Sequence, residues 1–234
     1  MNQYKTIGIL GGMSPAATAD LYNRIISIFQ NRFNAKYDKD FPEIVIISLP
    51  IPDIVENTEN EKLTISMLID AAKRLEAAGC SFIVIPCNTA HAYLKQIRNL
   101  VKIRIISIME EAGKFSMKQN LSNVGLLSTE FTKKKRLYKI ELDKFGISTI
   151  TFNDKKQKKL TRLIMEILKG NLNQSNKDSL LDFIKNLQNK NAEAVILGCT
   201  EFPLLIKQKD CDIKLIDTIE ILAEACVRES AKVI

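Results

Sequence analysis

This chain of 234 residues has no tryptophan, only 6% aromatic residues and one histidine, His91. So few rings supply poor platforms for stacking nucleic-acid bases. Its five cysteines contain no C-x-x-C pair, and their odd number and wide scatter do not fit a disulfide framework. With one imidazole and no paired cysteines, the sequence also argues against a zinc site. We therefore expect no metal ion and no disulfide, which leaves buried or reactive thiols.

Long apolar runs are also missing, since no stretch approaches the roughly 18 residues of a membrane span. The start, "MNQYKTIGILGG", lacks the basic and apolar regions of a secretory signal. We expect a cytoplasmic protein without a membrane partner.

The net charge of +7 raises the question of a nucleic-acid partner. However, the basic residues fall into local runs, "KKKRLYK" at 133–139 and "NDKKQKKLTR" at 153–162. We interpret these runs as solvated helix faces and expect no nucleic-acid partner.

Short apolar runs rich in β-branched residues alternate with longer segments of helical periodicity. Continuous apolar strands alternating with helices are typical of a parallel sheet covered on both faces, an α/β fold. The expected strands are 6–10, 43–49, 81–86, 103–108, 123–128, 147–152, 192–197 and 213–217. The expected helices are 16–31, 60–79, 89–101, 131–145, 156–169, 175–190 and 219–232.

The strands form two groups of similar layout, which indicates an internal duplication. "GILGGMS" is mirrored by "VGLLSTE", and "IVIPCNT" by "VILGCTE". We predict two similar α/β lobes, each a short parallel sheet flanked by helices. The first would comprise 1–108 plus 213–234, and the second 109–212.

The turn after the first strand, "GILGGMSPAATADLY", matches neither G-x-G-x-x-G nor a P-loop. Ser14 can cap a helix with Pro15 in its first turn. The turn is either a tight strand-to-helix connection or a site where backbone N–H groups hold an anion. The sequence leaves both interpretations open.

Cys87 and Cys199 each end an expected strand just before an expected helix. Ligands of open α/β sheets bind at the carboxyl ends of the strands. A helix N-terminus also favours the thiolate. A single free cysteine is usually a small buried hydrophobe, but two at equivalent positions favour function. The other three, Cys80, Cys211 and Cys226, lack this context and are expected to be inert.

Two such thiols admit several chemistries. The cytoplasm disfavours a disulfide. A cysteine nucleophile with His91 as its base would leave Cys199 unexplained. Racemisation accounts for both thiols, because one base removes a proton from one face of a stereocentre while an acid delivers a proton to the other.

The motifs "IGILGGMSPAAT", "PCNTAH" and "GCTE" resemble the PLP-independent aspartate/glutamate racemase family, in its aspartate racemase branch. The resemblance covers nearly the whole chain in the family's order. It implies two α/β lobes with the active site in the cleft between them, often assembled as homodimers, and no cofactor. It also implies an amino-acid substrate and Cys87 and Cys199 as the proton-transfer pair.

The same resemblance implies further site residues. Asn88, Thr89 and Thr200 would contact the carboxylate or ammonium group of a small amino acid. The remaining implied positions are Met13 and Ser14 in the first turn, Ser128 and Thr129 in its counterpart, and Lys169 in "EILKGN". Lys169 can equally be a helix-terminal lysine that interacts with the macrodipole. Glu201 and His91 are candidates for tuning the thiols, although we favour His91 as a satisfied helix residue.

One position departs from the family pattern. The aspartate-binding branch typically reads "IPDR" after the second strand, where this chain reads "IPDI" with Ile54. Isoleucine cannot form a bidentate clamp on a carboxylate. We therefore predict an amino-acid racemase whose preference for dicarboxylic substrates is weakened. The alternatives are an isomerase or decarboxylase of a small dicarboxylate on the same scaffold, or a non-catalytic small-anion binder.

Overall fold

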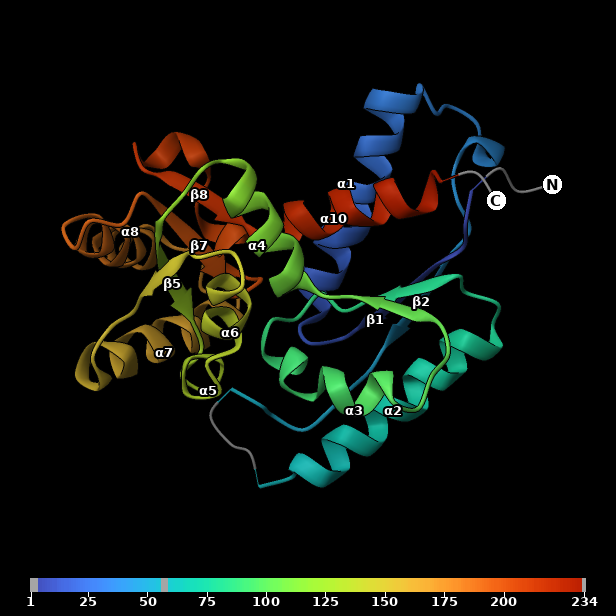
Figure 1. Ribbon diagram of the computed structural model, residues 1–234, viewed down its shortest axis with the longest axis horizontal. Helices are drawn as coiled ribbons and strands as arrows, with labels where there is room; N and C mark the ends of the chain where they lie inside the picture. Colours follow the sequence, from blue (N-terminus) through green and yellow to red (C-terminus); the bar gives the residue numbers. More distant parts are fainter. Residues whose placement is uncertain (1–3, 56–58, 233–234) are drawn as a thin grey trace. The chain divides into compact units, whose positions relative to one another are not determined.

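The computed structural model describes residues 4–55 and 59–232, and these divide into two compact units (Figure 1). The first unit comprises 1–53, 57–108 and 219–234, and the second comprises 54–56 and 109–218. None of the helices in the described ranges has the length and hydropathy that a bilayer span requires.

The first unit is built on a four-stranded parallel sheet in the order β2-β1-β3-β4. Figure 1 shows α1 and α10 on one side of this sheet and α2 and α3 on the other. The strands are β1 (Ile7–Gly11), β2 (Ile44–Ser48), β3 (Phe82–Val84) and β4 (Arg104–Ile106). The helices are α1 (Pro15–Phe33), η1 (Asp38–Asp40), α2 (Glu61–Ala77), η2 (Thr89–Tyr93), α3 (Leu94–Arg98) and α10 (Thr218–Ser230).

The second unit repeats this plan with a parallel sheet in the order β6-β5-β7-β8. Its strands are β5 (Asn123–Ser128), β6 (Ser148–Ile150), β7 (Ala194–Gly198) and β8 (Lys214–Asp217). Its helices are α4 (Ile108–Lys118), α5 (Glu130–Lys134), α6 (Leu137–Asp143), α7 (Asp154–Leu168), α8 (Gln174–Gln188), α9 (Phe202–Leu205) and η3 (Gln208–Asp210). The predicted α/β class with two parallel sheets flanked by helices is confirmed.

The expected placement of the last strand is wrong. We assigned 213–217 to the first lobe, but β8 pairs in parallel with β7, from Ala194↔Lys214 to Leu197↔Asp217. The chain returns to the first unit one element later, at α10. Lys5 N donates to Ser230 O at 3.0 Å, and Arg24 pairs with Glu220 at 2.8 Å, which fixes α10 to the first unit.

Helix α4 is absent from the expected elements. Its 11 residues follow directly after β4 and contain Gly113, which lowers helical propensity. The glycine is there for packing, because a Cβ at this position would lie 2.7 Å from the ring of Phe145.

The central strands are buried on both faces, as their apolar runs predict. All five residues of β1 and all five of β7 are buried. The carboxyl ends of parallel strands lie at one edge of their sheet. The polar side chains that follow these buried strands therefore gather at that edge.

Candidate functional site

Cys87 and its neighbours lie at the carboxyl edge of the first sheet. The segment follows β3, and Cys87 N donates to Ile85 O at 2.8 Å. Cys87 is 7% exposed, while Asn88 and Thr89, which begin η2, are 2% and 4% exposed. A thiol, an amide and a hydroxyl are thus withdrawn from bulk water at the end of one strand.

His91 is a neutral structural residue in this segment. Its Nδ1 lies 2.8 Å from Cys87 O, and its Nε2 lies 3.1 Å from Ile108 N. A backbone N–H can only donate, so Nε2 accepts from Ile108 and Nδ1–H donates to Cys87 O. Burial lowers the pKa of His91 from 6.5 to about 4. With both nitrogens engaged by the backbone, His91 is not a base for the Cys87 thiol.

The turn after β1 is packed tightly rather than open. Gly12 has a φ of 95°, and a Cβ there would collide with the backbone of Leu49. Gly12 N donates to Thr18 Oγ1 at 2.9 Å, and Thr18 Oγ1 donates to Ser14 O at 3.0 Å. The strand-to-helix interpretation therefore accounts for both glycine geometry and the Gly12 N–H group.

Ser14 caps α1, as expected, and accepts from Ala17 N at 3.4 Å. Met13 and Ser14 are partly exposed. Because β1 and β3 are paired in parallel, this turn and the Cys87 segment lie at the same edge of the sheet. The first unit thus gathers the five candidate residues predicted for it.

Cys199 occupies the matching place in the second unit, directly after β7. It is 6% exposed, and its Sγ donates to Glu201 Oε2 at 3.0 Å. Thr200 Oγ1 donates to the same carboxylate oxygen at 3.2 Å. Glu201 is itself only 4% exposed. A buried acceptor thus orients both the thiol and the neighbouring hydroxyl.

Ser128 is the last residue of β5, the strand paired with β7, and Thr129 follows it. Both are buried, and Thr129 caps α5 by accepting from Thr132 N at 3.2 Å. Gln157 Nε2, from the first turn of α7, donates to Ser128 O at 2.9 Å. The second unit therefore gathers Ser128, Thr129, Cys199 and Thr200 at one edge of its sheet.

Sequence reasoning missed Thr18 and Gln157, which hold the two turns. Thr18 follows Ser14 by one helical turn, a spacing that permits back-bonding to the backbone. Gln157 is 2% exposed on the apolar side of α7, and a polar residue at a buried helix position was its one signal.

Lys169 stands apart from this pattern. It is the C-cap of α7, its side chain is 63% exposed, and its Nζ pairs with Glu166 Oε1 at 2.8 Å. Ile54, by contrast, buries its side chain and is 6% exposed. The substrate-binding role of Lys169 remains a prediction.

Metal ligation has no support among the residues that the structure describes. No group of three or more His, Cys, Asp or Glu side chains there is arranged to hold an ion.

The sequence matches the family described as Asp/Glu/Hydantoin racemase over residues 10–226. A curated relative, the broad specificity amino-acid racemase RacX of Bacillus subtilis, is 28% identical over 221 residues. That alignment covers 94% of this chain and 96% of the relative.

Two solved structures have the same fold over nearly the whole chain. An aspartate racemase homologue from Pyrococcus horikoshii is 33% identical, with a TM-score of 0.80, and the match covers 96% of this chain and 98% of that one. The aspartate racemase of Picrophilus torridus is 29% identical, with a TM-score of 0.83 and coverage of 96% and 93%.

Proposed function

This chain belongs to the Asp/Glu/Hydantoin racemase family and is an amino-acid racemase, and we propose that Cys87 and Cys199 are its acid/base pair. One observation carries the proposal. The two units have the same strand order, and each places a cysteine at the carboxyl end of its third strand. Two groups of one chemical type suit a reaction that must run equally well in both directions.

The chemistry of the proposal balances with no external reagent. The thiolate of one cysteine takes the α-proton, and the thiol of the other donates a proton to the opposite face. The first cysteine then holds the proton and the second is the thiolate, which is the state needed for the reverse reaction. Each cysteine is the acid for one enantiomer and the base for the other.

Three side chains that follow the two cysteines in the sequence would hold the substrate. Asn88 and Thr89 can donate hydrogen bonds to the α-carboxylate and to the negative charge that develops on it when the proton leaves, and Thr200 joins them when its hydroxyl turns from Glu201 to the substrate. Donors preorganised toward developing charge usually provide the largest catalytic contribution in such sites. Their burial, 2–4% exposed, supports this role because hydrogen bonds strengthen away from water.

The proposed substrate is a small amino acid that need not be acidic. RacX is named for broad specificity, and Ile54 replaces the arginine expected to bind a second carboxylate. The substrate would also be lined by two turns, one with Met13 and Ser14 and the other with Ser128 and Thr129. Lys169 stays a candidate for contact with the substrate. We further propose a cytoplasmic homodimer that needs no cofactor.

Incubation of single enantiomers in deuterated water tests the acid/base pair. The wild type should incorporate deuterium at the α-carbon and lose optical rotation. Cys87→Ser and Cys199→Ser should each lose racemisation, because a serine hydroxyl is a far weaker acid than a thiol and does not ionise to the anionic base that the reaction needs. Each variant should still exchange the α-proton of the one enantiomer that its remaining thiol faces.

Cys211→Ser is the matched control, since Cys211 is a partly exposed cysteine outside the site, and it should racemise at the wild-type rate. Racemisation by Cys199→Ser at the wild-type rate would remove that thiol from the mechanism. Loss of carbon dioxide from the substrate would instead favour a decarboxylase.

A further inference from the structure

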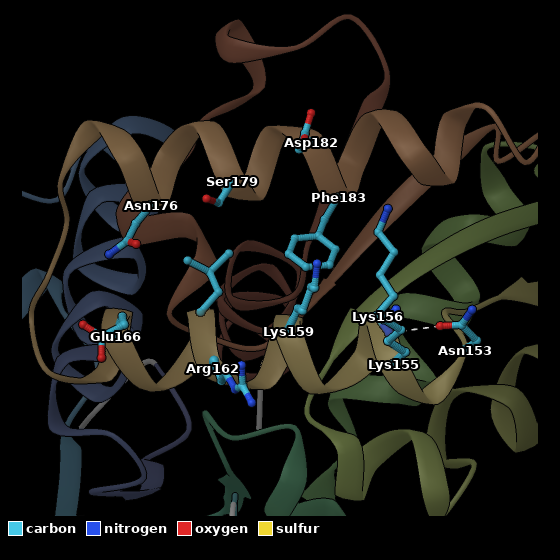
Figure 2. Close-up of a pocket in the computed structure, with 11 residues that line it drawn as sticks. Asn153, Lys155, Lys156, Lys159, Arg162, Glu166, Asn176, Ser179, Asp182 and Phe183 are labelled. Atoms are coloured by element: carbon cyan, nitrogen blue, oxygen red, sulfur yellow. Dashed lines mark hydrogen bonds between the residues drawn. The ribbon is translucent and has the colours of Figure 1, made fainter.

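Helices α7 and α8 enclose a groove of about 620 Å³ on the second unit, here called the α7–α8 groove (Figure 2). This volume lies in the range of small-molecule sites, about 300–1,000 Å³. None of its lining residues belongs to the predicted racemase site. Its charged lining consists of Lys155, Lys156, Lys159, Arg162, Glu166 and Asp182.

The four cations of the groove have no ion-pair partner in the part of the chain that the structure describes, although most neighbouring lysines do. Lys139 pairs with Asp143 at 2.9 Å and Lys144 with Glu141 at 2.7 Å, both within or next to α6. Of the two carboxylates in the lining, Glu166 is already paired with Lys169. Positive charge is therefore balanced locally on α6 and left unbalanced in the groove.

The cations are spread along the groove rather than clustered at one point. Lys155, Lys159 and Arg162 follow one another at spacings of four and three residues, so they share one face of α7. At about 1.5 Å per residue they span about 10 Å. An anion that engages all of them must carry several charges along an extended chain.

Lys156 is the cation of the groove that lies near two aromatic rings. Its Nζ lies 5.2 Å from the ring centroid of Phe152 and 5.5 Å from that of Phe183, and Figure 2 shows it reaching from α7 toward Phe183. Burial and the nearby Lys190 and Lys159 ammonium groups lower its pKa, against the opposing effect of Asp182. A bound anion would relieve this crowding of like charges.

We propose that the α7–α8 groove binds an organic polyphosphate, a small molecule with a chain of linked phosphates such as a nucleoside triphosphate. Phosphate oxygens are matched by the ammonium and guanidinium groups of α7. Asn176 of α8 lies on the opposite wall, where its Nδ2 donates one hydrogen to Asn171 O at 2.7 Å and keeps a second for a ligand.

A nucleic acid fits the groove less well. Phe183 is only 8% exposed, so its ring has little free face for stacking a base.

Calorimetric titration of the full chain tests this site. The probes are sodium tripolyphosphate, metal-free ATP, inorganic phosphate and a single-stranded oligonucleotide, all at low ionic strength. Tripolyphosphate and ATP should bind with similar affinity and more tightly than inorganic phosphate. The variant Lys159→Gln/Arg162→Gln should weaken both by about tenfold, the effect of removing two partly exposed charge pairs.

Lys139→Gln/Lys144→Gln is the control, because it also removes two positive charges, but from within or next to α6. It should change the affinity by less than about twofold. Equal weakening in both variants would show unspecific attraction to a basic protein and overturn the proposal. Absence of heat with both polyphosphates would overturn it too, as would an oligonucleotide that binds more tightly than either.

Discussion

His91 shows how one buried residue can set a pH dependence of stability. Its pKa is 6.5 when exposed and about 4 in the fold, so between these values the unfolded chain binds a proton that the folded chain refuses. The contribution of neutral His91 to the free energy of unfolding is therefore complete above about pH 6.5, and it is lost as the pH falls toward 4. The full difference corresponds to about 3 kcal/mol.

Because His91 is the single histidine of the sequence, this effect can be isolated. Between about pH 7 and about pH 5, it should cost the wild type about 2 kcal/mol of unfolding free energy. His91→Gln, which carries no titrating group, should show a shallower loss in urea titrations at the same pH values. Parallel losses in the two proteins would contradict the assignment.

The Glu201 carboxylate should influence when Cys199 ionises. Its oxygen lies 3.0 Å from Cys199 Sγ, and a negative charge there opposes formation of the thiolate. In Glu201→Gln the acid limb of the kcat/KM profile should move to lower pH, because this variant removes the carboxylate beside the thiol. Glu201→Asp, which keeps the charge, should move it less. An unshifted profile in the glutamine variant would separate Glu201 from the ionisation of Cys199.

Ile54 offers a test of substrate choice. Ile54→Arg should raise kcat/KM for aspartate relative to alanine by about tenfold, because a charge-assisted hydrogen bond to the second carboxylate contributes about 1.5–3 kcal/mol. Ile54→Met, which introduces an unbranched side chain without a charge, should leave the ratio of kcat/KM for aspartate to that for alanine unchanged. If the wild type already strongly prefers aspartate and arginine adds nothing, another group binds that carboxylate, and Lys169 is the first to replace.

Among the elements, the turn between β1 and α1 depends on Gly12. Gly12→Ala adds a Cβ against the Leu49 backbone at a φ of 95°, and we expect a loss of about 3 kcal/mol in unfolding free energy. Gly79 has a similar φ of 81°, but a Cβ there meets nothing within 4 Å. Gly79→Ala should therefore cost only about 1 kcal/mol. Equal costs in urea titrations would show that the Leu49 contact yields easily.

The elements also show what sequence can predict. Apolar runs such as "AVILG" identify strands because burial on both faces demands them, and the polar residues that follow mark the site edges. The lateral neighbour of β8 depends on long-range pairing, which no local pattern encodes, and α4 was hidden by Gly113 and a short length. Contacts such as Cys199–Glu201 and Gln157–Ser128 depend on side-chain orientation in space, so spacing alone could not predict them.

For the whole molecule, the repeated strand order supports an internal duplication. Each sheet has its first strand in the centre, the second at one edge and the third and fourth on the other side. If the second sheet repeats the order of the first, its fourth strand, β8, must lie beside its third strand, β7. The two cysteines then occupy equivalent positions in the two repeats.

The helix that follows the fourth strand of each sheet belongs to the other unit: α4 after β4, and α10 after β8. Besides the bond from Lys5 N, Ser230 Oγ donates to Lys5 O at 2.8 Å, so Lys5 lies against the last turn of α10. Joining the termini and reopening the chain before Ile219 would yield a circular permutant in which 219–234 directly precedes 1–108. Apart from 54–56, each unit would then be one continuous stretch, encoded as two consecutive halves of a gene.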